Sequence, residues 1–142
     1  MNILFINTSD QLGGAAIAAK RLMHALNNKH IKVNMLVRDK TSNDYNVIPI
    51  DQTAKLTYNF LVERFRIWWA NKFSKKNLFA VSLANTGSSI VNLPEFKEAD
   101  IIHLHWINQG YISLRELRKI IISGKPVVWT MHDMWPITGI CH

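Results

Sequence analysis

The sequence predicts an α/β domain in which helices flank a mainly parallel sheet. Three observations predict it. Apolar strand-like runs alternate with helix-like stretches, a glycine-ended turn joins the first run to the first helix, and an apolar run near the C-terminus stops abruptly at polar residues. Because parallel strands need right-handed crossovers, we expect a Rossmann-like domain. The 142 residues, 48% of them hydrophobic, suit a single domain with a buried core.

The chain begins with the pattern of a strand, a turn, a helix and a second strand. Residues 2–7 predict a first strand, apolar at positions 3–6, that runs into a polar turn ending at Gly13 and Gly14. An alanine-rich helix is expected over residues 15–26, and residues 31–37 alternate as a second strand. The expected buried face of the helix consists of Ala15, Ala18, Leu22 and Ala25 with Leu26.

The middle of the chain has weaker signals. Residues 47–50 predict a short strand at a sheet edge, because Pro49 cannot donate a ladder hydrogen bond. A long helix is expected from residue 53 to about residue 76, with large apolar residues at helical spacing and basic residues between them. A short helix is expected to open at Pro94, ahead of the next strand.

Two strands and a capped helix complete the predicted domain. Residues 101–105 form a strand candidate that ends in an aromatic and polar patch at residues 106–110. The following helix begins at a capping box made by Ser113 and Glu116. The apolar run that starts at Val127 is the last predicted strand.

Composition narrows the class of protein. The formal net charge of +7 favours anionic partners, and most of the excess lies between Lys55 and Lys76, where Glu63 is the single acid. No apolar run approaches the roughly 18 residues that cross a bilayer, and no signal peptide is visible, so a cytosolic protein is expected. The lone Cys141 cannot form an internal disulfide.

The basic, aromatic helix between Lys55 and Lys76 has two interpretations. In one, its aromatic side chains lie in a membrane interface while its cations meet anionic lipid headgroups. In the other, Leu61, Phe65 and Trp68 belong to the core and the cations form a solvated face. The two can hold together. The residues concerned are the aromatics Phe60, Phe65, Trp68, Trp69 and Phe73 and the cations Arg64, Arg66, Lys72, Lys75 and Lys76.

The turn at Gly13 and Gly14 is a candidate ligand site, because ligands in open α/β sheets bind beyond the carboxyl ends of the strands. The glycines let the backbone approach a ligand, and the helix start behind them favours a phosphate or another anion. The turn matches neither the dinucleotide nor the P-loop glycine pattern. A plain strand-to-helix turn is the alternative.

His132 and Asp133 follow the last predicted strand, at the same sheet edge. This is where a general base, or a donor to a developing negative charge, is placed. The alternative is a loop in which Asp133 caps a turn and Trp135 fills the core.

Histidines raise the question of a metal site. His103 and His105 lie two residues apart on one face of a strand, a spacing that can ligate zinc, but no acidic cluster is nearby. We expect His103 to be packed or hydrogen-bonded within the sheet and His105 to reach the cleft. Cys141 and His142 with His132 are a weaker candidate set. No metal site is therefore predicted.

Three motifs, in this order and spacing, resemble the N-terminal half of a family 4 glycosyltransferase of the GT-B fold, and the resemblance spans nearly the entire chain. They are residues 2–7 running into Gly13-Gly14-Ala15, then residues 100–106, then residues 126–136. The resemblance implies transfer of a sugar from a nucleotide-sugar to an acceptor with retention of configuration, usually without a bound metal. The cleft for this reaction would lie between two Rossmann-like domains.

The resemblance also implies roles for individual residues. Gly13 and Gly14 would approach the diphosphate or sugar region of the donor, and His132 would contact the donor sugar as the catalytic-site residue. The acceptor-side or cleft-shaping residues would be His105, Trp106, Asn108, Asp133 and Trp135. No cofactor is implied beyond the nucleotide-sugar co-substrate.

The leading expectation is the acceptor-side domain, spanning residues 1–142, of a retaining glycosyltransferase in cell-surface polysaccharide or glycolipid synthesis. The family's second Rossmann-like domain is absent from the chain, so the domain is expected to be incomplete at its C-terminal end and inactive alone. The expected partners are a nucleotide-sugar, a glycan or lipid-linked acceptor, the second domain and an anionic membrane surface at Lys55 to Lys76, but not nucleic acid. The expected location is the cytoplasm, at the inner face of the membrane.

Two other classes of function remain open from the sequence. One is a non-catalytic α/β module that binds a phosphorylated ligand at Gly13 and Gly14. The other is a metal hydrolase that uses His103, His105 and His132, although no acidic ligand completes the set.

Overall fold

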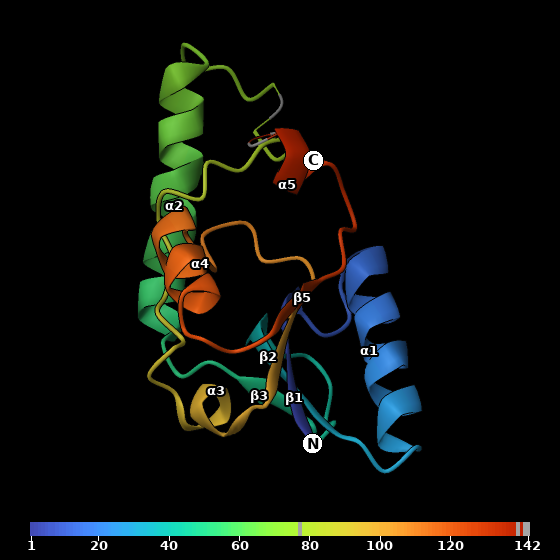
Figure 1. Ribbon diagram of the computed structural model, residues 1–142. Helices are drawn as coiled ribbons and strands as arrows, with labels where there is room; N and C mark the ends of the chain where they lie inside the picture. Colours follow the sequence, from blue (N-terminus) through green and yellow to red (C-terminus); the bar gives the residue numbers. More distant parts are fainter. Residues whose placement is uncertain (77, 139, 141–142) are drawn as a thin grey trace.

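The computed structural model describes residues 1–76, 78–138 and 140, and it has the α/β fold that the sequence predicts (Figure 1). Within these residues, five strands form one parallel sheet in the order β3-β2-β1-β4-β5. The strands are β1 (Asn2–Ser9), β2 (Lys32–Asp39), β3 (Val47–Pro49), β4 (Ile101–Leu104) and β5 (Val127–Trp129). This is the predicted Rossmann-like arrangement, with β1 at its centre.

Helices cover both faces of the sheet. They are α1 (Gly13–Asn27), α2 (Thr53–Ala70), α3 (Pro94–Glu98), α4 (Leu114–Ile121) and α5 (Trp135–Thr138). Figure 1 shows α1 on one face, α2, α3 and α4 on the other, and α5 beyond the carboxyl ends of the strands. None of the described helices is both long and apolar enough to cross a bilayer.

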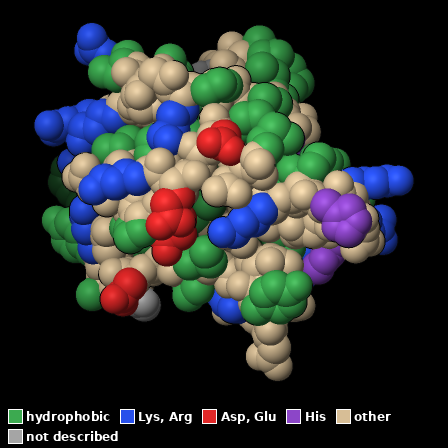
Figure 2. Space-filling model, turned by 60° about the horizontal axis from the view of Figure 1, so that its bottom comes forward, with side chains coloured by type: hydrophobic (Ala, Val, Ile, Leu, Met, Phe, Trp, Pro, Cys, Tyr) green, Lys and Arg blue, Asp and Glu red, His purple; other side chains and the backbone are tan. Residues whose placement is uncertain are grey.

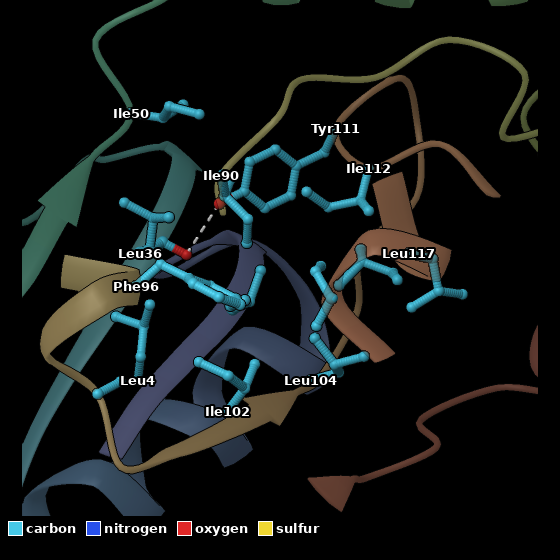
Figure 3. Packing of buried hydrophobic residues seen from close by; sticks show 14 of the residues in the cluster. Leu4, Leu36, Ile50, Ile90, Phe96, Ile102, Leu104, Tyr111, Ile112 and Leu117 are labelled. Atoms are coloured by element: carbon cyan, nitrogen blue, oxygen red, sulfur yellow. Dashed lines mark hydrogen bonds between the residues drawn. The ribbon is translucent and has the colours of Figure 1, made fainter. Parts of the chain in front are cut away.

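The alternation of side chains along the strands divides the core into two clusters. On the α1 face, Phe5 and Met35 pack with Met23 of the helix. The larger cluster lies on the opposite face, where side chains from the sheet pack with those of α2, α3 and α4. Figure 3 shows this cluster, with Phe96 of α3 and Leu117 of α4 among the labelled residues. The fully buried Tyr111 lies there and donates its hydroxyl to the carbonyl of Leu36 at 3.2 Å. Both faces of β1 are therefore covered, as expected of a central parallel strand.

The short elements lie where the sequence predicts them. β3 is an edge strand and contains Pro49, and α3 begins at Pro94. Ser113 caps α4, because its Oγ accepts a hydrogen bond from the Glu116 N–H at 3.3 Å. The Glu116 carboxylate accepts a hydrogen bond from Lys119 at 2.7 Å.

The buried face of α1 differs from the predicted face. Ala16, Ala19 and Met23 are buried. The side chains on the solvent side are Ala18, Leu22 and Ala25, all of which were predicted to be buried. Small and apolar side chains lie all round this helix, so both sets have helical spacing and periodicity does not select between them.

The interpretation of Leu61 and Phe65 as core residues of α2 is wrong, because both side chains are exposed. The helix instead turns the ion pair of Glu63 and Arg64 inward, so Arg64 is not a solvated cation either. The helix ends at Ala70 rather than near residue 76. An aromatic stripe at helical spacing shows that a helix has an apolar face, but not what covers that face.

Candidate functional site

Three segments meet beyond the carboxyl ends of the neighbouring strands β1, β4 and β5. β1 leads into the glycine turn and α1, β4 leads to Trp106, and the chain after β5 leads to His132. Together these segments line an open pocket of about 320 Å³. Its lining residues are Leu12, Gly13, Gly14, Ala15, Trp106, His132 and Asp133.

Asn7 and Thr8, at the end of β1, fix the segment after β4. The Asn7 side-chain oxygen accepts a hydrogen bond from the Trp106 N–H at 2.9 Å. The backbone N–H and the hydroxyl of Thr8 both donate to the Trp106 carbonyl, at 2.7 and 2.8 Å. Asn7 and Thr8 are both buried, and buried polar groups stabilise a fold only when they are paired. These bonds therefore set the position of Trp106 relative to the glycine turn.

The turn before α1 is shaped by Ser9 and Gly13. The Ser9 hydroxyl oxygen accepts a hydrogen bond from the Leu12 N–H at 3.0 Å. Gly13 has φ +86°, a left-handed conformation that favours glycine. Apart from the neighbouring residues and the backbone of α1 itself, no heavy atom lies within 4 Å of the position that a Cβ would take at Gly13 or Gly14. Leu12 is the N-cap residue and its side chain cannot cap the helix, so the first N–H groups of α1 suit an anion.

Asp10 ties this turn to the segment after β2. Its fully buried carboxylate accepts hydrogen bonds from the N–H and hydroxyl of Thr41, at 2.8 and 2.9 Å, and from the N–H of Ser42 at 2.9 Å. Burial acts to raise the pKa of Asp10, but the hydrogen bonds from Ser42 and Thr41 outweigh it and hold the pKa at about 2. Asp10 is therefore an ionised anchor behind the pocket.

Three imidazole rings form a stack beside the pocket. The ring centroids of His103 and His105 are 4.3 Å apart, and those of His105 and His132 are 5.2 Å apart. His105 Nδ1 lies 3.0 Å from His132 Nε2. His103 Nε2 lies 2.8 Å from the Thr130 hydroxyl, so His103 is hydrogen-bonded as its strand position predicts. His105 is thus the hydrogen-bonding partner that positions the His132 ring.

The stack keeps its histidines neutral. Burial, together with the nearby His103 and His132, lowers the pKa of His105 to about 3. Burial also lowers the pKa of His103, and the nearby His132 lowers it further. Burial lowers the pKa of His132 as well, although the nearby Asp133 acts in the opposite direction. A neutral imidazole carries one donor and one acceptor nitrogen.

The other ring nitrogen of His105, Nε2, indicates whether His105 or His132 donates the hydrogen bond between the two rings. Nε2 of His105 is buried and has no hydrogen-bond partner among the described residues. An unpaired buried N–H is rarer in proteins than an unpaired acceptor. We therefore assign the proton of His105 to Nδ1, so that it donates to His132 Nε2 and leaves His132 Nδ1 as a donor.

Asp133 and Trp135 shape the loop after β5. The Asp133 carboxylate accepts hydrogen bonds from the Trp106 indole N–H at 2.6 Å and from the Trp135 N–H at 3.0 Å, where α5 begins. Trp135 is buried and its indole donates to the Ser82 carbonyl at 2.8 Å. This is the turn-capping and core-filling arrangement that the sequence offered as the alternative to a catalytic Asp133.

The structure therefore brings most of the predicted site residues together. Gly13, Gly14, Trp106, His132 and Asp133 line one pocket. His105 is bonded to His132 directly behind it, whereas Asn108 and Trp135 are buried and are not among the lining residues. Sequence analysis missed Asn7, Ser9 and Asp10, although their polarity at the end of an apolar strand is a signal for site residues.

The metal hypotheses gain no geometric support. In the described part of the chain, no group of three or more His, Cys, Asp and Glu side chains is arranged to hold a metal ion. The facing nitrogens of His105 and His132 are bonded to each other. Cys141 and His142, the weaker candidate set, lie outside the described residues.

Comparison of the chain with models of protein families, with curated proteins and with solved structures found no match.

The buried histidines predict that acid destabilises the fold. An ordinary histidine side chain has a pKa of 6.5, whereas the pKa of His105 in the folded protein is about 3. Between these two pH values the unfolded chain binds more protons than the folded chain, so the free energy of unfolding falls as the pH falls. From about pH 7 to about pH 5 the expected loss from His105 alone is about 2 kcal/mol. His103 and His132 add to it, whereas Asp10, with its pKa of about 2, contributes only at lower pH.

Urea unfolding at the two pH values checks this expectation. His105→Phe, which fills a similar volume without ionising, is expected to lose clearly less stability on acidification than the unmodified chain. An equal loss in both proteins would show that His105 does not cause the pH dependence.

Proposed function

We propose that the protein is the acceptor-side domain of a retaining glycosyltransferase, which transfers a sugar from a nucleotide-sugar to a glycan or lipid-linked acceptor in cell-surface polysaccharide synthesis. The observation that supports this most directly is the convergence on one pocket of the three motifs that carry the resemblance. Each motif alone is common. In this chain, however, the glycine turn, Trp106 and His132 lie together at the edge of the sheet where ligands bind in such folds.

The pocket offers suitable groups for the donor. The N–H groups at the start of α1, next to Gly13 and Gly14, suit the diphosphate, because nothing stands over the two glycines. His132 is neutral and carries a donor proton, so it can hydrogen-bond a sugar hydroxyl or oxygen without introducing a charge. His105 acts as a positioning residue, since it accounts for one nitrogen of His132 and fixes which nitrogen donates.

In this proposal the other half of the donor site lies on a second Rossmann-like domain. The pocket is consistent with that, because its described walls come only from the sheet edge and the start of α1. The 142-residue chain alone is therefore expected to bind a nucleotide-sugar weakly and to transfer no sugar. Turnover by the purified chain would contradict the requirement for a second domain.

Titration of isotope-labelled protein with UDP- and GDP-sugars, followed by NMR, tests the site. We expect the amide signals of Gly13, Gly14 and His132 to move first, and Gly14→Leu to weaken binding at least about tenfold, because its side chain enters the open space beside the pocket. Ala18→Leu is the matched control, since Ala18 is exposed on the same helix and does not line the pocket.

The same titration separates the alternative, a non-catalytic module that binds a phosphorylated ligand. In that case inorganic pyrophosphate would bind at Gly13 and Gly14 as tightly as any nucleotide-sugar, and His132 would not respond. If every nucleotide-sugar shifted only amide signals far from the glycine turn, both functions would be contradicted.

A further inference from the structure

Helix α2 exposes a stripe of large apolar side chains and buries an ion pair, although Leu56 and Ile67 on its inner side are buried as in an ordinary surface helix. The side chains of Leu61, Phe65 and Trp69 are 58%, 56% and 62% exposed, whereas Glu63 is fully buried and Arg64 nearly so. Surface helices normally turn the apolar stripe to the core and the charges to solvent. The large exposed stripe therefore marks a surface that something else covers.

The stripe is mainly aromatic. Its residues, which we call the α2 stripe, are Tyr58, Leu61, Phe65, Trp69 and Phe73. The first four recur at helical spacing on one side of α2, and Phe73 follows just after the helix ends. The rings of Trp69 and Phe73 contact each other with centroids 5.2 Å apart. Figure 1 shows the C-terminal half of α2 extending beyond the sheet.

Exposed cations lie in the same segment as this stripe. They are Lys55, Arg66, Lys72, Lys75 and Lys76, and all five are exposed. The one acid of the segment, Glu63, is turned inward and lies 3.1 Å from Arg64, so it does not neutralise them. None of the five forms an ion pair with an acidic side chain within the described ranges. On the face at the N-terminal ends of the strands, by contrast, basic and acidic side chains are interspersed (Figure 2).

We propose that the α2 stripe lies in the interface of an anionic bilayer, with α2 parallel to the surface. Exposed Trp, Tyr and Phe flanked by Lys and Arg are the chemistry that binds at the level of lipid headgroups. A second copy of this chain fits less well, since a symmetric contact would bring the same five cations of both copies together. This inference is independent of the proposed sugar transfer, because it uses none of the pocket residues.

Co-sedimentation with vesicles tests the surface. The chain is expected to bind vesicles of phosphatidylcholine with about a third phosphatidylglycerol, and to bind pure phosphatidylcholine far more weakly. Replacing Lys72, Lys75 and Lys76 with Gln is expected to weaken binding to the anionic vesicles on the order of 100-fold. The matched control, Arg21, Lys29 and Lys32 to Gln, removes the same charge from exposed residues outside the segment 55–76 and is expected to have a much smaller effect.

Two double substitutions test the apolar side chains of the α2 stripe. Phe65→Ser with Trp69→Ser is expected to abolish binding, whereas Tyr45→Ser with Ile122→Ser, which changes two exposed apolar residues elsewhere, is expected to leave it unchanged. All four residues are exposed, so the variants should fold, and circular dichroism verifies it. Equal binding of the two double variants, equal binding to neutral and anionic vesicles, or no binding overturns the proposal. So does a lipid-free dimer that the Phe65 and Trp69 changes dissociate, because a second copy would then cover the stripe.

Discussion

Replacing Gly87 with alanine is expected to destabilise the fold by about 3 kcal/mol or more. A Cβ at this position would lie 2.1 Å from the backbone nitrogen of Ser113 and 2.7 Å from the carbonyl carbon of Ile112. Both are backbone atoms, so no side chain can rotate out of the way. The two segments are also tied together here, because the Ser88 N–H donates to the Tyr111 carbonyl at 2.8 Å. Room for a methyl group therefore requires the backbone of Ile112 and Ser113, or that of the Gly87 segment, to move.

Urea unfolding measured by circular dichroism checks this result. Gly14→Ala is the matched control, because no atom lies within 4 Å of its Cβ position and the residue is helical, where alanine is favoured over glycine by roughly 0.5–1 kcal/mol. The control is expected to be as stable as the unmodified chain or slightly more so. If Gly87→Ala lost less than about 1 kcal/mol, the close approach of the two segments would be wrong.

Replacing Glu63 with alanine is expected to cost about 3–5 kcal/mol. One carboxylate oxygen accepts hydrogen bonds from the N–H groups of Leu83 and Ala84, at 2.7 and 2.9 Å, and the other lies 3.1 Å from the Arg64 guanidinium. The Glu63 side chain is fully buried. Its removal would leave two N–H groups without their acceptor and Arg64 without its counter-charge. Ala84 would also lose the bond that holds it at φ +46°.

Two variants calibrate the Glu63 measurement by urea unfolding. Glu63→Gln keeps an oxygen for the Leu83 and Ala84 amides but removes the charge, so it is expected to lose less than Glu63→Ala. Asp100→Ala removes an exposed carboxylate that lies 3.9 Å from the N-terminal ammonium group, a kind of pair that contributes at most about 1 kcal/mol. A Glu63→Ala protein as stable as Asp100→Ala would show that the buried ion pair does not hold α2 in place.

The order of the elements was predictable because strands and caps have local signals. The alternation from Val33 to Val37, the proline in β3 and the Ser113 cap each depend on a few neighbouring residues. Helix faces were less predictable. In α1 the alanines make several faces equally apolar, and in α2 the strongest aromatic stripe faces away from the core. Periodicity finds an apolar face, but which face is buried depends on tertiary packing.

The site shows the same limit. Gly13, Trp106 and His132 could be predicted to lie together, because each follows a strand and parallel strands end at the same edge. The contacts that hold these three residues in place could not be predicted. The bond between His105 and His132 depends on side-chain rotamers, and the burial of Asp10 against Thr41 depends on where two loops approach. Pairs of residues so far apart along the chain leave no pattern in a single sequence.

The place of β1 in the middle of the sheet has a consequence for how the chain is made. β2, the first neighbour of β1, begins at Lys32, whereas its other neighbour, β4, begins only at Ile101. A nascent chain on the ribosome therefore carries β1 with the N–H and C=O groups of one edge unpaired until most of the domain has been synthesised. Asn7 accepts a hydrogen bond from Trp106 and Thr8 donates one to it, so neither bond can form before Trp106 is synthesised, and the pocket is among the last parts of the domain to form.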